Sequence, residues 1–499
     1  MTGTLLGARP KRAWFGKISF GKISAGFLYL GLCGPPLLFG SRLPIIVAGW
    51  CAVLGAGLLF APVRRLRRGQ LLVLGVLAFI TLCFGFVLHE QVADHPWVAQ
   101  FNPVWAEASK VLGDQLTPSV SIVRGEPLFA LGPSLANTLA LVLGLLVGAD
   151  RNRALRAVRV LAWAGVCYAV YGILALELDP THILGREKTA YVGDLTSTFI
   201  NRNTAAAYFG SCSCIWLVLL CDTIRKSLPR GPIEWRRLPG HLLAKTRTRL
   251  LVRFVMLWVC VAAMLMTSSR GGVLVSLAIM MLVFLLYFRR ELPRGKGLLT
   301  VLIAGVGGSA FLLQVLAGNV TDRIETLGLG DVGRLWTYRS TLRIIADNPW
   351  FGTGLGTFAA AFPPYRSDNM SLQYAWDLAH STPLEFASEM GIPLAFLVAA
   401  AWIAAILVLA RALRGRKRDM IVPLSAFGVA LIANLHSFID FSLQIAGYSI
   451  VVFGLVGLGL SQAAQISMSQ TLIGEKRSAN ASKELSGGQT PEDISVNSI

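Results

Sequence analysis

The residues best suited to chemistry are one histidine and a set of arginines in the middle and later parts of the chain. His380 directly precedes the segment Ser-Thr-Pro-Leu-Glu. Thr382 can act as the N-cap of a helix, Pro383 as its first residue and Glu385 as the reciprocal partner of a capping box. The positive end of that helix would disfavour a charged imidazole ring. We therefore expect His380 to be a neutral base that accepts a proton, with an ordinary structural role as the alternative.

Three carboxylates near this histidine could orient it, and the sequence leaves the choice open among Asp377, Glu385 and Glu389. Further along, His436 and Asp440 are four residues apart, so they could meet on one helical face in a structural hydrogen bond. The chain has no histidine or carboxylate motif with metal spacing and no phosphate-binding loop of the ATPase type. The sequence therefore predicts no metal site and no cofactor.

Two arginines lie in short polar motifs at the ends of apolar runs. Arg202 lies in Phe-Ile-Asn-Arg-Asn, and Arg270 lies in Ser-Ser-Arg-Gly-Gly. A guanidinium group binds a diphosphate through paired hydrogen bonds and stays charged at any relevant pH. The glycines after Arg270 allow close backbone approach, and the helix after them adds an anion-binding N-terminus. The pattern indicates a site for an anionic lipid headgroup, with simple anchoring to lipid phosphates as the alternative.

Arg334 opens a third arginine segment, residues 334–347. Apolar residues recur there at spacings of three and four, and they are Leu335, Tyr338, Leu342 and Ile345. This spacing predicts one apolar face of a helix. Arg339 and Arg343 share another face with Trp336, so we expect the helix to lie at a membrane surface with its cations toward the headgroups, or to be purely structural. The glycine-rich segment 352–358 predicts a tight loop, because no strand precedes it as in a nucleotide fingerprint.

Membrane-spanning helices must position these residues. The chain has 499 residues, of which 54% are hydrophobic and 15% charged. Soluble domains carry about 25% charged residues, so the composition excludes a soluble globular enzyme. Twelve apolar runs are each long enough to cross a hydrocarbon core of about 30 Å. Within a few residues at each end, they are 23–39, 43–62, 71–88, 128–148, 160–176, 204–220, 251–266, 273–288, 298–316, 392–410, 421–438 and 445–460.

Basic residues indicate how the runs are oriented. With the N-terminus in the cytoplasm, 34 of the 46 lysines and arginines fall in cytoplasmic segments, in agreement with the positive-inside rule. The net charge of +19 is then mainly an orientation signal, and we expect no nucleic-acid partner. We predict one membrane domain over residues 1–464, both termini in the cytoplasm, and outer loops at about 89–126 and 317–391. Residues 465–499 have the composition of a disordered tail.

Four ordered blocks resemble the bacterial O-antigen ligase and O-antigen polymerase superfamily. They are FINRNTAAAY (199–208), TSSRGG (267–272), GRLWTYR with the following DNPWFGTGLGTF (333–358), and HSTPLEFASEMG (380–391). The blocks span about 190 residues in the carboxy-proximal half of the chain. The first half carries no matching motif, which leaves the acceptor open.

The resemblance implies an all-α fold similar to integral-membrane glycosyltransferases and an inverting, metal-independent glycan transfer. The donor would be a glycan on undecaprenyl diphosphate, used at the periplasmic face of the bacterial inner membrane. His380 is then the expected general base. The residues expected to hold the diphosphate are Arg202, Arg270, Arg334 and Arg339. Membrane lipids and a chain-length regulator or export protein are the further partners that we expect.

The acceptor separates two enzymatic alternatives. In polymerisation of an exopolysaccharide or O-antigen the acceptor is another lipid-linked glycan, whereas in an O-antigen ligase it is lipid A core. We favour polymerisation because nothing in the sequence identifies a site for core sugars. A transporter for a small anion is a third alternative, but the motif residues cluster at one face, whereas carrier sites usually lie at mid-membrane.

Overall fold

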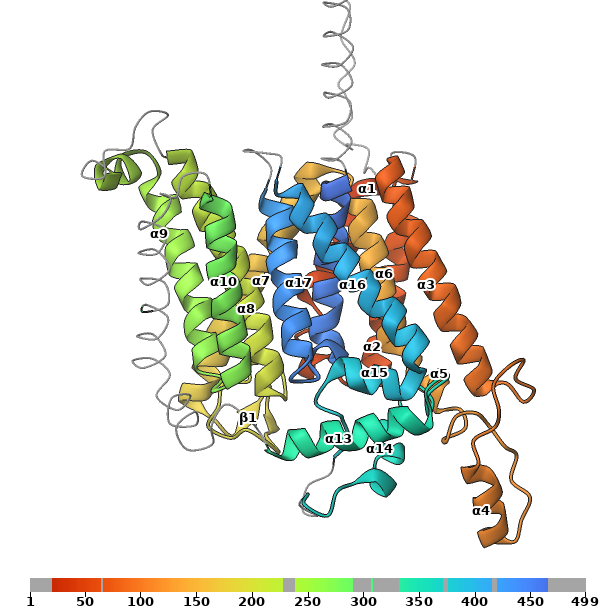
Figure 1. The fold of residues 1–499 in the computed structure, drawn as a ribbon. Coiled ribbons are helices and arrows are strands. Elements are labelled where there is room, and N and C mark those ends of the chain that lie inside the picture. Colours follow the sequence, from red (N-terminus) through yellow and green to blue (C-terminus); the bar gives the residue numbers. More distant parts are fainter. Residues whose placement is uncertain are drawn as a thin grey trace, which may run out of the picture.

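The computed structural model describes residues 20–63, 66–227, 238–289, 307, 332–370, 376–414 and 420–464. Within these residues, apolar helices run alongside one another in a bundle (Figure 1). Eight segments are long and apolar enough to cross a membrane. They are Arg68–Val92 (α3), Glu126–Val147 (α5, Glu126–Phe129, with α6, Leu131–Val147), Arg151–Leu178 (α7), Arg202–Ser227 (α8), Arg247–Leu265 (in α9, Leu238–Leu265), Arg270–Phe288 (α10), Ile392–Ala412 (α16) and Ala446–Ala464. The protein is therefore a polytopic membrane protein.

Three shorter apolar helices complete the described part of the bundle: α1 (Phe20–Cys33), α2 (Pro44–Leu59) and α17 (Ile421–Ser437). Every predicted run except 298–316 coincides with one of these apolar helices. That run lies outside the described residues apart from residue 307, so the total of twelve stays a prediction. The predicted tail, 465–499, and the start of the second predicted loop, 317–331, also lie outside them.

Several predicted boundaries are wrong by several residues, and two of them have a clear local cause. Helix α1 ends at Cys33 rather than at 39, because Gly34 and two prolines follow it. Helix α7 begins at Arg151 rather than at 160. The reason is a cap: the Asp150 carboxylate accepts hydrogen bonds from the backbone N–H groups of Asn152 (2.9 Å) and Arg153 (3.1 Å). The polar stretch before the apolar run therefore continues the same helix.

Helix α8 and the helix Ala446–Ala464 form the buried centre, whereas α3 and α16 lie at the rim with few side chains buried. Small residues let the central helices approach closely. A Cβ added at Gly210 of α8 would lie 1.9 Å from the Ser276 Oγ, and one at Gly144 would lie 2.2 Å from the Gly454 carbonyl oxygen. The apolar rim is the surface expected to face lipid.

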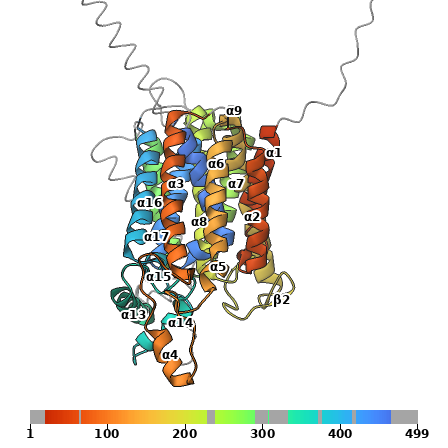
Figure 2. The ribbon, with the colours of Figure 1, turned by 90° about the vertical axis from the view of Figure 1, so that its right-hand side faces the viewer.

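The two ends of the bundle differ (Figure 2). One end carries α4 (Val104–Leu112), the antiparallel strands β1 (His182–Ile183) and β2 (Arg186–Glu187), α13 (Val332–Asp347), α14 (Phe358–Ala361) and α15 (Thr382–Met390). We call it the loop end. The opposite end holds both ends of the described chain, where the Gln70 side-chain amide donates to the Ser461 hydroxyl (2.6 Å).

Helix α13 lies across the loop end instead of along the bundle (Figure 1). The predicted apolar face is wrong in part: Ile345 is buried, but Leu335 and Leu342 are 55% and 53% exposed. The helix instead buries Thr337, Ser340, Thr341 and Ile344. Its threonines can be buried because their hydroxyls donate to the helix's own backbone, as that of Thr341 does to the Thr337 carbonyl (2.8 Å).

The glycine-rich segment 352–358 is a tight loop, as predicted. Gly352, Gly354 and Gly356 all have positive φ angles, which side chains rarely adopt. A Cβ at Gly352 would lie 2.2 Å from the backbone of Glu389. Gln91, at the end of α3, holds this loop through hydrogen bonds. Its side-chain amide donates to the carbonyls of Phe351 (2.7 Å) and Glu389 (2.8 Å). The loop thereby sets the position of α15.

Candidate active site

The turn that follows α17, residues 438–444, is the point where several predicted site residues meet. Asp440 lies at its centre and is 1% exposed. Its carboxylate accepts hydrogen bonds from the Asn203 side-chain amide (2.6 Å) and the Ser442 hydroxyl (3.3 Å). The Arg334 guanidinium lies 3.6 Å from the same carboxylate. A buried carboxylate needs such partners, because an unpaired charge in the interior is strongly unfavourable.

Arg334 ties α13 to the turn by a second contact. Its guanidinium donates to the backbone carbonyl of Ile439 (2.6 Å), and the side chain stays 27% exposed. Tyr338, one helical turn later, donates its hydroxyl to the carbonyl of His380 (3.1 Å). Helix α13 thus contacts both the turn and the histidine segment through residues four apart on one face.

Arg202 and Arg270 are the first residues of α8 and α10. The two helix starts are joined, because the Ser269 hydroxyl donates to the Asn203 side-chain oxygen (2.8 Å). Asn203 in turn binds Asp440, as described above. Arg202 and Arg270 are therefore the sequence neighbours of Asn203 and Ser269. These two residues are linked by hydrogen bonds to each other and to Asp440 in the turn.

The glycines after Arg270 let other side chains of the protein pack closely against the start of α10, and the predicted approach to an anionic ligand stays a prediction. A Cβ at Gly271 would lie 2.4 Å from the Ile439 side chain, and one at Gly272 would lie 2.6 Å from the Cβ of Ala206. The Ser269 hydroxyl accepts a hydrogen bond from the Gly272 N–H (3.4 Å) and so caps α10.

Arg202 is held on two sides by a loop that sequence reasoning missed. Its guanidinium pairs with the Asp194 carboxylate and lies 4.9 Å from the centre of the Tyr191 ring. Neither Tyr191 nor Asp194 follows an apolar period or belongs to one of the four blocks. The packing of Tyr191 and Asp194 against α8 depends on tertiary structure, so the sequence offered no signal for them.

Arg339 does not reach the turn in the described part of the chain. It lies on the exposed side of α13, with its guanidinium 4.8 Å from the centre of the Trp336 ring. The contact with Trp336 agrees with the predicted shared face. No contact among the described residues supports the prediction that Arg339 joins the other arginines. The face of α13 that carries Arg339 points away from the residues that the helix buries.

His380 lies against the same turn. Its ring packs edge-on against Phe441, with ring centres 5.1 Å apart, and against Trp376 at 5.9 Å. Its backbone has a φ of 54°, a left-handed value that is uncommon outside glycine and often occurs at functional sites. The side chain is half-buried. The histidine is therefore held in one orientation beside the turn that binds Arg334.

The predicted capping box at this histidine is wrong. Helix α15 begins at Thr382 with Ser381 as its N-cap, and neither side chain caps it. The Glu385 carboxylate instead accepts a hydrogen bond from the backbone N–H of Ala379 (2.6 Å). The left-handed turn at His380 explains the difference, because it folds the preceding N–H group back over the start of the helix.

Glu385 is thus the carboxylate that contacts the histidine segment. Burial and the nearby charge of Glu389 raise the pKa of Glu385 well above its ordinary value. Glu389 accepts from the Phe358 N–H (3.0 Å) instead, and burial raises its pKa to about 7. Asp377 is exposed.

His436 and Asp440 are linked, but not on a helix as predicted. Helix α17 ends at Ser437, so Asp440 lies beyond it. The link runs through Ser442, whose hydroxyl lies 3.0 Å from the His436 Nδ1 and 3.3 Å from the Asp440 carboxylate. Both ends of the link are buried, which indicates a structural role.

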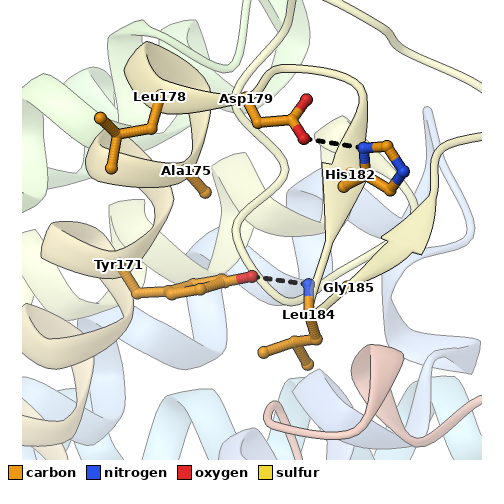
Figure 3. A pocket seen from close by; sticks show the side chains of 7 residues that line it. All are labelled: Tyr171, Ala175, Leu178, Asp179, His182, Leu184 and Gly185. Carbon is orange, nitrogen blue, oxygen red and sulfur yellow. Dashed lines mark hydrogen bonds and ion pairs between the residues drawn. The ribbon is translucent and has the colours of Figure 1, made fainter.

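A separate open pocket lies between α7 and the β1–β2 hairpin (Figure 3). It is lined by Tyr171, Ala175, Leu178, Asp179, His182, Leu184 and Gly185. The Tyr171 hydroxyl accepts from the Leu184 N–H (2.8 Å), and His182 pairs with Asp179 (2.8 Å). These contacts fix the hairpin on α7, and the hairpin leads directly into the loop that carries Tyr191.

No group of three or more histidine, cysteine, aspartate or glutamate side chains that could hold a metal ion occurs in the residues that the structure describes. The positive charges at the turn are those of arginine.

Comparison with known proteins gives one family match. The model of the O-antigen ligase family matches residues 255–399, which include Arg270, Arg334, His380 and Glu385. No curated protein matches the chain. The match supports glycan transfer of the O-antigen ligase or polymerase type by a membrane enzyme that uses a lipid-linked glycan and an acceptor. This match supports the resemblance of residues 255–399 to the O-antigen ligase and polymerase superfamily.

Proposed function

We propose that the protein transfers a glycan from undecaprenyl diphosphate to an acceptor glycan at the periplasmic face, and so polymerises a surface polysaccharide. The observation that carries this proposal is that a half-buried histidine and one arginine contact the 438–444 turn, while two further arginines begin helices whose adjoining residues are hydrogen-bonded to Asp440 of that turn or to its partner Asn203. The residues concerned are His380, Arg202, Arg270 and Arg334.

The proposed reaction is a direct displacement at the anomeric carbon. An acceptor hydroxyl attacks this carbon while His380 removes the hydroxyl proton. The bond from carbon to the diphosphate oxygen breaks, and the electron pair leaves with undecaprenyl diphosphate. Attack opposite the leaving group inverts the configuration.

The arginines would stabilise the charge that grows on the leaving diphosphate. Arg202 and Arg334 each lie beside a carboxylate, Asp194 and Asp440, which fixes the direction of the guanidinium. A guanidinium has five N–H donors, so one carboxylate does not use them all. For Arg339, its exposed place on α13 favours a contact with lipid headgroups at the membrane surface.

The distribution of basic residues supports a periplasmic loop end. Basic side chains gather at the opposite end, where the positive-inside rule expects the cytoplasm. They are Arg67, Arg68, Arg151, Arg153, Arg156, Arg159, Arg225, Lys226, Arg253, Arg289, Arg411 and Arg414.

The glycan pools of a deletion strain test this function. The lipopolysaccharide ladder, the secreted polysaccharide and the lipid-linked intermediates are compared with those of the parent. Polymerisation predicts single repeat units left on core or on the lipid carrier. Long polymer retained on undecaprenyl diphosphate above bare core would instead identify a ligase, and unchanged pools would reject glycan transfer.

A further inference from the structure

Tyr191 has a fixed and unusual conformation in the loop between β2 and α8. Its φ is 58°, a left-handed value that costs a non-glycine residue on the order of 1 kcal/mol. Hydrogen bonds hold the surrounding loop at several points. The Lys188 ammonium donates to the Asp194 carbonyl (3.1 Å), and the Leu195 N–H donates to the Met266 carbonyl (3.0 Å). Strain held in this way is typical of functional sites.

The Tyr191 side chain lies among the charges of the proposed donor site. Its ring packs on the guanidinium of Arg202 (4.9 Å from ring centre), whose other partner is Asp194. Burial raises the pKa of the phenol, the charge of Asp440 raises it further, and the charges of Arg202 and Arg334 lower it, with a net increase. The hydroxyl is thus a protonated donor within electrostatic reach of two arginines that come from different helices.

The part of the fold that the structure describes makes no use of this hydroxyl. Within the residues that the structure describes, no hydrogen bond of the Tyr191 hydroxyl occurs, and the side chain is only half-buried. Two other tyrosines at the loop end do use theirs: Tyr338 donates to the His380 carbonyl (3.1 Å) and Tyr365 to the Asp347 carboxylate (2.8 Å). A strained, rigid tyrosine whose hydroxyl has no hydrogen-bond partner among the described residues is suited to bind a ligand.

We propose that Tyr191 is a further donor-binding residue, whose hydroxyl donates a hydrogen bond to the diphosphate of a polyprenyl-diphosphate glycan while its ring holds Arg202 in place. This inference rests on the proposed function. It adds to the site a residue outside the segment that matches the family model, residues 255–399.

Binding of undecaprenyl diphosphate to the purified full chain in lipid nanodiscs tests the proposal. Tyr191→Phe keeps the ring on Arg202 and removes the hydroxyl, so we expect about tenfold weaker binding, as for loss of one hydrogen bond to a charged group. Tyr191→Ala also removes the ring and should bind more weakly still. Tyr365→Phe is the matched control, and we expect it to bind as the wild type does, because its hydroxyl contacts Asp347.

Wild-type affinity of Tyr191→Phe would overturn the inference. This variant decides the question even if Tyr191→Ala fails to fold, because phenylalanine preserves the packing. Arg202→Ala and Arg334→Ala separate the inference from the function on which it rests. If both bind the probe as the wild type does, the proposed donor site fails. If they bind weakly while Tyr191→Phe binds normally, only the role of Tyr191 fails.

Discussion

His380 is oriented through backbone contacts on both of its sides. The N–H of the preceding residue, Ala379, donates to Glu385, and its own carbonyl accepts from Tyr338. These contacts hold the left-handed backbone that turns the ring toward Phe441. The proposed general base must be held within hydrogen-bond reach of the proton that it removes, so we expect both contacts to affect the rate.

Glu385 should therefore affect turnover more than binding. We expect Glu385→Ala to lower kcat about tenfold with little change in KM for the donor, because one hydrogen bond of the histidine segment is lost. Glu385→Gln should restore most of kcat, because its amide oxygen can still accept from Ala379. Glu107→Ala removes an exposed carboxylate of α4 and is the control. Equal kcat in Glu385→Ala and the wild type would contradict this role.

Arg270 should be sensitive to a change that keeps its charge. Arg270→Lys retains the positive charge but loses the planar fork that binds a diphosphate through two bonds. We expect at least a tenfold loss in kcat/KM for the donor. Arg414→Lys, at the opposite end of the bundle, makes the same change far from the site and should have wild-type activity. Undiminished turnover of Arg270→Lys would mean that this arginine only anchors its helix.

At the scale of elements, α15 depends on a buried acid and on a glycine junction. Burial raises the pKa of Glu389 to about 7, so the folded state binds this proton more tightly than the unfolded chain does. The contribution of Glu389 to the free energy of unfolding should then fall as pH rises from about 4.5 to about 7 and be lost above that. We expect a lower Tm at pH 8 than at pH 5 in detergent, and a smaller difference in Glu389→Gln. An identical pH dependence in both proteins would refute this coupling.

Gly391 joins α15 to α16 and has no room for a side chain. Its φ is 82°, and a Cβ would lie 2.1 Å from the Trp350 carbonyl oxygen. Gly391→Ala should cost about 1–3 kcal/mol of stability, as for other strained backbone positions. Gly49→Ala in α2 is the matched control, because no atom lies within 4 Å of the added Cβ. Thermal unfolding in detergent compares the two, and similar Tm values would count against a constrained junction.

Local patterns predicted the helices well and the site only in part. Apolar runs are local, so they located every described spanning helix; Arg202 was placed at a helix start, and Arg270 in the turn just before the helix that it in fact begins. The face of α13 was predicted wrongly because the bundle buries residues such as Thr341 and leaves Leu335 exposed. The contacts of Asp440 with Asn203 and Arg334 join segments far apart in sequence, which no single-sequence pattern reveals.

At the scale of the whole molecule, the proposed glycan transfer requires the loop end to face the periplasm. Glu107 on α4 is exposed at the loop end, and Lys226 is exposed at the opposite end. A membrane-impermeant maleimide should label Glu107→Cys in cells whose inner membrane is intact. It should label Lys226→Cys only after that membrane is permeabilised. The reverse pattern would place the candidate site in the cytoplasm and reject a periplasmic reaction.

The most direct test of His380 as the general base is the surface glycan of a deletion strain that expresses His380→Ala. We expect full-length protein to accumulate in the membrane at the wild-type level, while surface glycan is lost and lipid-linked donor builds up. Wild-type protein from the same vector must restore the glycan. A normal glycan profile with His380→Ala would rule out this role, because the transfer would then proceed without its proposed base.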